Sequence, residues 1–172
     1  MVTKINIITT GGTIEKTYDE FDGSLSNRGS QLRKMIDRLR LPYVELQHRD
    51  LLCKDSLNMT DEDRGKVLES VREILPQQTP VLILHGTDTM DVTARFLFDN
   101  LPELSAPVVL TGAMKPFGFE DSDALQNFTE ALMACQLIAP GVYISMHGRL
   151  HQLPGVAKNK SKGTFYKVNN VP

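Results

Sequence analysis

Two turns in the sequence combine glycine with hydroxyl side chains, and each turn follows a short apolar run. Thr9–Ile14 reads TTGGTI and His85–Thr89 reads HGTDT. A glycine pair lets backbone N–H groups approach a ligand closely, because glycine has no Cβ. A threonine hydroxyl becomes a useful nucleophile when a neighbouring base or cation helps to remove its proton. Threonine and aspartate also cap helices, so one such turn alone indicates capping, whereas two at equivalent strand ends favour a binding or catalytic site.

The elements that position these turns are predicted from the hydrophobic pattern. Short apolar runs predict strands, over residues 5–8, 43–47, 81–84, 108–110 and 142–146. Apolar residues at helical spacing predict helices between them, over residues 32–39, 60–75, 91–101 and 124–135. Parallel neighbouring strands need crossover helices. The predicted fold class is therefore α/β, a three-layer sandwich with a mostly parallel, Rossmann-like sheet flanked by helices.

In such a sheet, ligands bind beyond the carboxyl ends of the strands, which is where both turns lie. The chain contains neither a GxGxxG fingerprint nor a P-loop motif, so dinucleotide and P-loop chemistry have no support. His85 is interpreted as a packing residue, and Met133 and Cys135 as core residues. Residues 148–172 have no hydrophobic period and are expected to form a loop, with residues 155–172 as its C-terminal tail.

Composition limits the possible classes of protein. The chain has 172 residues, about the length of one domain, so we expect a single domain over residues 1–172. With 19 Lys and Arg against 21 Asp and Glu, the net charge is −2, which argues against nucleic-acid binding. The longest apolar runs are too short to cross a membrane, and the N-terminus lacks a signal-peptide pattern. Two widely separated cysteines, Cys53 and Cys135, predict a reduced, cytoplasmic protein without a metal site.

Four segments of the chain resemble conserved motifs of the bacterial-type L-asparaginase family. They are Thr10–Ile14 (TGGTI), Asp55–Thr60 (DSLNMT), His85–Met90 (HGTDTM) and Thr111–Pro116 (TGAMKP). Their order, separation and placement at strand ends fit the N-terminal domain of that family. The resemblance covers essentially the whole chain, and typical members continue into a second domain. It implies a short-chain, single-domain member.

The resemblance implies an amidohydrolase that converts L-asparagine and water to L-aspartate and ammonia, with no cofactor and no metal. Thr13 matches the threonine that attacks the side-chain amide and forms an acyl-enzyme. Thr87, Asp88 and Lys158 match a second group that activates the other threonine or the attacking water. Lysines at positions 160 and 162 remain alternatives to Lys158, because the alignment of this loop with the family motif can shift by a few residues.

Substrate-binding roles follow from the same resemblance. Ser56 matches a residue that binds the α-carboxylate of the substrate, and Asp88 also receives the α-ammonium group. The backbone N–H groups of Gly12 and Gly86 are candidate donors for the oxyanion. Tyr18 is either the tyrosine of the mobile lid that the family carries or a solvated loop residue.

One departure bears on specificity, since Leu57 stands where many members have a polar residue that helps to hold the α-ammonium. We therefore expect a high KM for asparagine or a wider substrate range. Two alternatives stay open: an amidase on another small amide, and a non-catalytic amino-acid-binding module. The expected partners are a small-molecule substrate and further copies of the chain in a homodimer or higher homo-oligomer, with no nucleic acid and no membrane.

Overall fold

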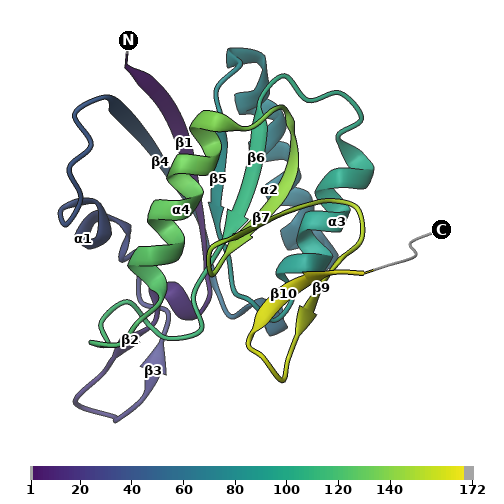
Figure 1. Cartoon of the computed structure of the whole chain (residues 1–172). Helices are drawn as coiled ribbons and strands as arrows, with labels where there is room; N and C mark the ends of the chain where they lie inside the picture. Colours follow the sequence, from purple (N-terminus) through teal and green to yellow (C-terminus); the bar gives the residue numbers. More distant parts are fainter. Residues whose placement is uncertain (1, 169–172) are drawn as a thin grey trace.

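A mostly parallel sheet of six strands forms the centre of the molecule, in the order β4-β1-β5-β6-β7-β8 (Figure 1). The computed structural model describes residues 2–168. The strands are β1 (Thr3–Gly11), β4 (Val44–Lys54), β5 (Val81–Leu84), β6 (Pro107–Thr111), β7 (Gly141–Met146) and β8 (Arg149–Gln152). Neighbours from β4 to β7 pair in parallel, and β8 pairs antiparallel to β7. The predicted α/β class is confirmed.

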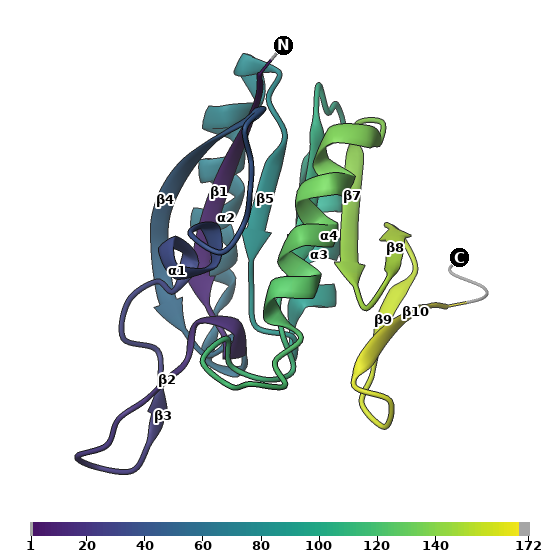
Figure 2. The same ribbon diagram turned by 60° about the vertical axis from the view of Figure 1, so that its left-hand side comes forward.

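Helices cover both faces of this sheet and complete the three layers. They are α1 (Leu32–Ile36), α2 (Asp61–Ile74), α3 (Met90–Asn100) and α4 (Ala124–Leu137). Helices α2 and α3 lie on one face, and α1 and α4 on the other (Figure 2). Thr60 and Asp63 form the capping box that begins α2, which satisfies backbone N–H groups at the helix start.

Strand β5 explains why the sheet needs two covered faces. All four of its residues are fully buried. Leu82 and Leu84 belong to the apolar cluster under α4, whereas Val81 and Ile83 belong to the cluster under α2 and α3. Full burial of one such side chain contributes about 1.5–3 kcal/mol, so both clusters stabilise the strand that leads into the HGTDT turn.

The C-terminal segment differs from the sequence-based expectation. The predicted loop and tail contain strand β8 and a hairpin of β9 (Val156–Asn159) and β10 (Thr164–Lys167). Each of these strands has only four residues, which is too few to show a hydrophobic period. Phe165 is only 2% exposed and packs into the cluster under α3, so burial rather than pattern orders the hairpin. Residues 169–172 of the predicted tail lie outside the described residues.

A second hairpin lies near the N-terminus. Strands β2 (Thr17–Tyr18) and β3 (Leu25–Ser26) pair antiparallel over two residues each, and the hairpin projects away from the sheet (Figure 2). Helix α1 follows it and has only five residues, fewer than the predicted 32–39, because the chain turns after Ile36 toward β4.

Candidate active site

The two glycine turns meet at the carboxyl ends of β1 and β5, at the lower edge of the sheet in Figure 1. Gly12 has a φ of 82°, and a Cβ atom there would lie 2.4 Å from Gly86 Cα. A Cβ atom on Gly86 would lie 2.6 Å from Ser56 Oγ. Since only glycine permits this approach, Gly12, Gly86 and Ser56 bring three segments of the chain into contact.

Lys158 reaches the same place from β9. Its Nζ atom donates hydrogen bonds to Thr87 Oγ1 at 2.8 Å and to Asp88 Oδ1 at 2.6 Å. The lysine side chain is only 7% exposed, so the carboxylate of Asp88 compensates a charge that would be costly to bury alone. The structure therefore brings Thr87, Asp88 and Lys158 together, whereas Lys160 and Lys162 are exposed.

The hydroxyl proton of Thr87 has a weak acceptor. Because Lys158 donates to Thr87 Oγ1, the hydroxyl directs its own proton to Met114 Sδ, at 3.6 Å. Thioether sulfur accepts hydrogen bonds poorly. The Thr87 proton is thus held loosely, next to a cation that would stabilise the developing alkoxide.

Ser56 contributes a buried hydroxyl that lacks a partner. Its side chain is almost completely buried and its Oγ atom makes no hydrogen bond within the described residues. Its carbonyl accepts a hydrogen bond of 2.8 Å from Thr89 Oγ1, which fixes the 3-10 helix of Ser56–Asn58 against the second turn. An unpaired buried polar group costs about 1–3 kcal/mol, so the Ser56 hydroxyl is suited to a ligand. Leu57, beside it, is exposed.

Thr13 begins the 3-10 helix Thr13–Glu15, directly after Gly12. Its side-chain hydroxyl makes no hydrogen bond to any of residues 2–168. The Gly11 and Gly12 N–H groups are both occupied, by Glu15 Oε2 at 3.0 Å and by the Lys54 carbonyl at 2.8 Å. In this conformation the Gly12 N–H is thus not free to donate to an oxyanion, so that predicted role stays a prediction, and Gly12 permits the close approach to Gly86.

Glu15 is a residue of the site that the motif analysis missed. Burial raises the pKa of its carboxyl from 4.5 to about 7, although hydrogen bonds from Ser30 and Gly11 act in the opposite direction. Ser30 Oγ donates to Glu15 Oε1 at 2.5 Å. An acidic residue two positions after Thr13 was the available signal. Its contacts join the Thr13 turn to Ser30, in the segment that follows the β2–β3 hairpin.

His85 holds the second turn in place through contacts of both ring nitrogens. Burial lowers the pKa of its imidazole to about 4, so the ring is neutral. Nδ1 lies 2.7 Å from the Gly86 carbonyl, and Nε2 lies 2.9 Å from Thr93 Oγ1. A neutral ring that donates from Nδ1 accepts at Nε2, which satisfies both contacts and fixes Gly86. These contacts agree with packing rather than acid–base work.

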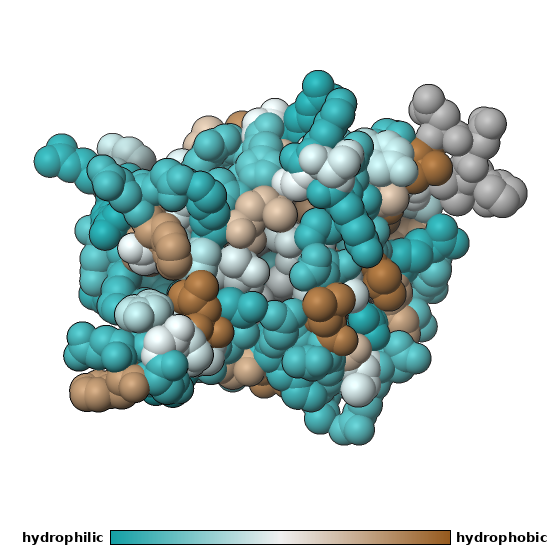
Figure 3. Space-filling view, turned by 90° about the horizontal axis from the view of Figure 1, so that it is seen from below, coloured by the Kyte–Doolittle hydropathy of each residue, from teal (hydrophilic) through white to brown (hydrophobic). Residues whose placement is uncertain are grey.

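Tyr18 lies apart from these residues. It sits on β2 and is 64% exposed, and Lys16 at the base of the hairpin pairs with Asp55 at 2.7 Å. A polar cavity of about 500 Å³ separates the hairpin from the Ser56 turn, and its lining includes Lys16, Asn27 and Asp55. Seen from below, residues of intermediate hydropathy lie at the centre, surrounded by hydrophilic residues and a few separate hydrophobic ones (Figure 3).

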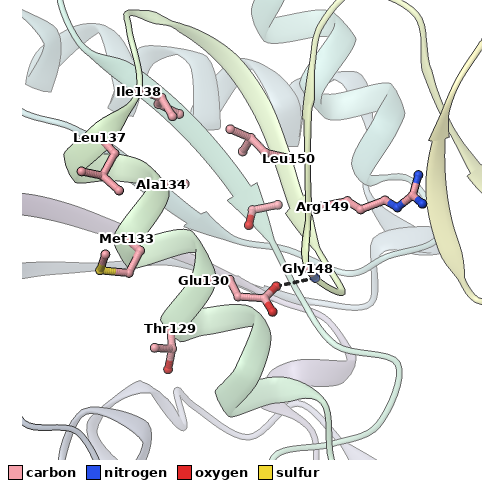
Figure 4. A pocket seen from close by; sticks show the side chains of 10 residues that line it. Thr129, Glu130, Met133, Ala134, Leu137, Ile138, Gly148, Arg149 and Leu150 are labelled. Carbon is pink, nitrogen blue, oxygen red and sulfur yellow. Dashed lines mark hydrogen bonds between the residues drawn. The ribbon is translucent and has the colours of Figure 1, made fainter.

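An apolar groove of about 430 Å³ lies elsewhere, between α4 and the β7–β8 edge (Figure 4). Met133, predicted as a core residue, is 52% exposed on this groove, because the helix turns that side of α4 away from the sheet. Cys135, on the opposite side, is buried as predicted. Glu130 Oε2 accepts a hydrogen bond of 2.7 Å from Gly148 N at the rim.

Residues 2–168 contain no membrane-spanning helix and no cluster of metal-ligating side chains. None of their helices is both long and apolar enough to span a membrane. No group of three or more His, Cys, Asp or Glu side chains in this part of the chain is arranged to hold a metal ion.

Comparison with known proteins gives consistent matches along the whole chain. A family model described as asparaginase, N-terminal, matches residues 4–170. The L-asparaginase of Thermococcus kodakarensis is 29% identical over 168 residues, which are 96% of this chain and 51% of that protein. A glutamyl-tRNA(Gln) amidotransferase subunit from Methanococcus vannielii is 31% identical over 180 residues, which are 98% of this chain and 42% of that protein.

Solved structures agree with these sequence matches. The thermostable L-asparaginase from Thermococcus kodakarensis superposes with a TM-score of 0.86 at 29% identity, over 98% of this chain and 52% of that chain. L-asparaginase I from Vibrio cholerae superposes with a TM-score of 0.80 at 26% identity, over 100% of this chain and 53% of that chain. The chain thus spans about half the length of the relatives that it matches.

Proposed function

The chain belongs to the asparaginase family, and from this premise we propose that it is an L-asparagine amidohydrolase, which converts L-asparagine and water to L-aspartate and ammonia. The observation that carries the proposal is the buried Lys158 side chain, which bonds to both Thr87 and Asp88 across about 70 positions of sequence. A lysine, a carboxylate and a hydroxyl held together at strand ends are the groups that acyl transfer needs.

The proposed nucleophile is Thr13. Its Oγ atom attacks the side-chain amide carbon, the hydroxyl proton is transferred to the departing nitrogen, and the C–N bond breaks to release ammonia. Water then adds to the resulting ester, and breakage of the ester C–O bond releases aspartate and restores the Thr13 hydroxyl. The absence of a hydrogen bond from Thr13 Oγ1 to the other described residues supports this role, because the hydroxyl stays available to the substrate.

Lys158 and Asp88 are proposed to activate Thr87, or the water that attacks the ester. The weak acceptor Met114 Sδ supports this assignment, since a loosely held proton is transferred at lower cost. The oxyanion of each tetrahedral intermediate needs a preorganised donor, and removal of one such donor typically costs about 10²–10³ in kcat. We assign that donor to the backbone N–H of Gly86.

Substrate recognition is proposed to rest on Ser56 and Asp88. The unpaired hydroxyl of Ser56 would donate to the α-carboxylate, and the partly exposed Asp88 carboxylate would accept from the α-ammonium. The polar cavity under the β2–β3 hairpin adjoins Asp55 and gives the substrate an entrance. Tyr18 closes this entrance in the proposed bound state, as a lid residue.

The protein is further proposed to work without metal or cofactor, in the cytoplasm, as a homodimer or higher homo-oligomer. Two unpaired cysteines, Cys53 and Cys135, support a reducing compartment. Exposed apolar side chains, such as Leu137 and Leu150, support self-association. Light scattering of the purified chain measures the oligomeric state directly, and a strictly monomeric species would contradict that part of the proposal.

The test of the proposed activity is ammonia release from L-asparagine. Thr13→Ala removes the nucleophile and is expected to lower kcat by at least about 10⁴-fold, whereas Thr17→Ala, on the neighbouring strand, is expected to leave kcat within about twofold. Chelator is expected to change nothing. Wild-type turnover that survives Thr13→Ala would refute the threonine mechanism.

A second candidate is an amidase on a different small amide. Exposed Leu57 favours it, since an apolar side chain there offers nothing to an α-ammonium, and so does the similarity to amidotransferase subunits. Turnover of asparagine, glutamine and succinamic acid, measured side by side, separates the two candidates, because succinamic acid lacks the α-amino group. A non-catalytic amino-acid-binding module, the third alternative, has no use for the Lys158 contacts and would release no ammonia from any of them.

A further inference from the structure

The β9–β10 hairpin that carries Lys158 is fixed at its base. Lys167 Nζ donates to the Gln152 and Pro154 carbonyls at 2.7 and 2.8 Å, and Phe165 is buried. In the register of the hairpin, Lys158 pairs with Phe165, and Thr164 precedes Phe165 on the same strand. Among the hydrogen bonds of residues 2–168, those of residues 159–166 reach beyond the β9–β10 hairpin only through Thr164.

Thr164 bonds to His147, which follows β7. Its Oγ1 atom lies 3.1 Å from His147 Nδ1, and His147 Nε2 lies 2.8 Å from Asp123 Oδ2. A carboxylate only accepts hydrogen bonds, so Nε2 donates to Asp123, and in the tautomer with a single proton at Nε2 the Nδ1 atom accepts from the Thr164 hydroxyl. His147 has a φ of 52°, and its backbone N–H donates to Asn127 Oδ1 at 3.0 Å, which holds this uncommon conformation.

Asp123 connects His147 to the turn after β6. Its carboxylate accepts hydrogen bonds from Met114 N at 2.9 Å, Lys115 N at 3.0 Å and Asn127 Nδ2 at 2.9 Å. Burial acts to raise the pKa of this carboxyl, but the backbone N–H of Met114 and the His147 ring together hold it below its usual range. Asp123 is therefore ionised, as the tautomer of His147 requires.

These contacts close a ring around the candidate site. From Lys158 the ring runs through the hairpin to Thr164, His147 and Asp123, and on to Met114. Met114 Sδ accepts from Thr87 Oγ1, which accepts from Lys158 Nζ. The ring thus joins the two segments that carry the lysine and the hydroxyl that it contacts, beside the direct bond from Lys158 N to Asp91 Oδ2 of α3 at 3.1 Å.

We propose that His147, held between Thr164 and Asp123, is a positioning residue that sets the distance from Lys158 Nζ to Thr87 and Asp88. The proposal rests on the proposed function for its catalytic consequence. A residue with only a general stabilising role would affect the whole hairpin. A positioning role instead predicts that the reactivity of Lys158 changes while the hairpin stays folded. Thr164→Val removes the hydroxyl and keeps the shape, and Thr164→Ser keeps the hydroxyl, so the two variants separate the bond from the packing.

The first experiment labels lysines with acetic anhydride and measures the rate at each residue by mass spectrometry. Thr164→Val is expected to raise the rate at Lys158 about fivefold, the population shift that loss of one hydrogen bond typically gives, with Lys160 and Lys162 unchanged. Thr164→Ser and the surface control Thr129→Val are expected to match wild type. An unchanged Lys158 rate, or a common rise at all three lysines, would overturn the proposal.

The second experiment measures turnover in the same variants. Thr164→Val is expected to lower kcat about tenfold with KM within about twofold, since the lost geometry matters in the transition state. His147→Asn, which tolerates a positive φ, is expected to lower kcat similarly, and the double variant no further. Additive losses, or a loss confined to KM, would contradict the proposal. Because labelling needs no turnover, an inactive wild type would count against the proposed amidohydrolase and leave the labelling result to decide the role of His147.

Discussion

Two antiparallel hairpins extend from the sheet beside the candidate site, and they are built differently. The β9–β10 hairpin buries Phe165 and places Lys158 within hydrogen-bond distance of Thr87. The β2–β3 hairpin exposes its aromatic residues, Tyr18 at 64% and Phe21 at 93%. One hairpin therefore holds a charged group in fixed geometry, whereas the other exposes its aromatic residues and lacks such an anchor, which is typical of segments that open easily.

The strongest test of this contrast is removal of the fixed lysine. Lys158→Met keeps the length of the side chain and removes the ammonium group, and we expect kcat to fall by about 10²–10⁴-fold, the range typical of positioned proton-transfer groups. Lys162→Met, on the turn of the same hairpin, is expected to change kcat less than about twofold. Steady-state ammonia release measures both. A larger loss in Lys162→Met would reverse the assignment of the lysine.

The anchor of the fixed hairpin gives the next largest effect. Phe165→Ala is expected to lower the free energy of unfolding by about 3–5 kcal/mol, because it removes a large side chain from a packed cluster. Tyr166→Ala, at the exposed neighbouring position, is expected to stay within about 0.5 kcal/mol. Urea unfolding followed by circular dichroism gives both values. Equal losses would show that Phe165 is not the anchor.

Glu15, which joins the Thr13 turn to the segment after the β2–β3 hairpin, predicts a pH effect. Its pKa is about 7 in the folded protein and 4.5 in the unfolded reference, so the folded state binds the extra proton between these values. Stability therefore falls as pH rises from about 4.5 to about 7, by about 3 kcal/mol in total, and levels off above.

Glu15→Gln is neutral at every pH and is expected to flatten this part of the profile. The measurement is urea unfolding of both proteins at several pH values from about 4.5 to about 8, a range that spans both pKa values. If the stability of the wild type instead rose with pH over this range, and rose faster than that of the variant, the Glu15 carboxyl would be ionised when buried.

Tyr18 provides the smallest expected effect and tests the β2–β3 hairpin. Tyr18→Ala is expected to raise KM for asparagine about tenfold with kcat nearly unchanged, because a lid residue contributes mainly to binding. Phe21→Ala, which is still more exposed on the same hairpin, serves as the control with no change in KM. Equal KM values for wild type and Tyr18→Ala would remove the lid role and leave a solvated tyrosine.

The sequence predicts the sheet better than the two hairpins. Strands buried on both faces, such as Val81–Leu84, have continuous apolar runs, and their helices have a clear period. Strands β9 and β10 mix lysines with few apolar residues, and only the tertiary contact of Phe165 reveals why they form.

For the site, the motifs locate Thr13, Thr87 and Asp88, whereas Lys158 could be placed only to within a few residues. The bonds from His147 to Thr164 and Asp123 join residues 17 and 24 positions apart with no repeating spacing. Such contacts depend on the path of the chain between strands, which sequence periodicity does not contain. The occupied N–H of Gly12 was missed for the same reason, since its acceptor is the carbonyl of Lys54 on another strand.

The separation of Lys158 from Thr87 along the chain, 71 positions, also bears on the order of folding. Contacts between distant positions form slowly, because loop-closure entropy must be overcome first. During synthesis and refolding, the helices and the central strands can assemble before the lysine arrives. We expect helical circular dichroism to recover earlier than ammonia release, so that a nearly complete fold exists for a time as an inactive precursor of the proposed enzyme.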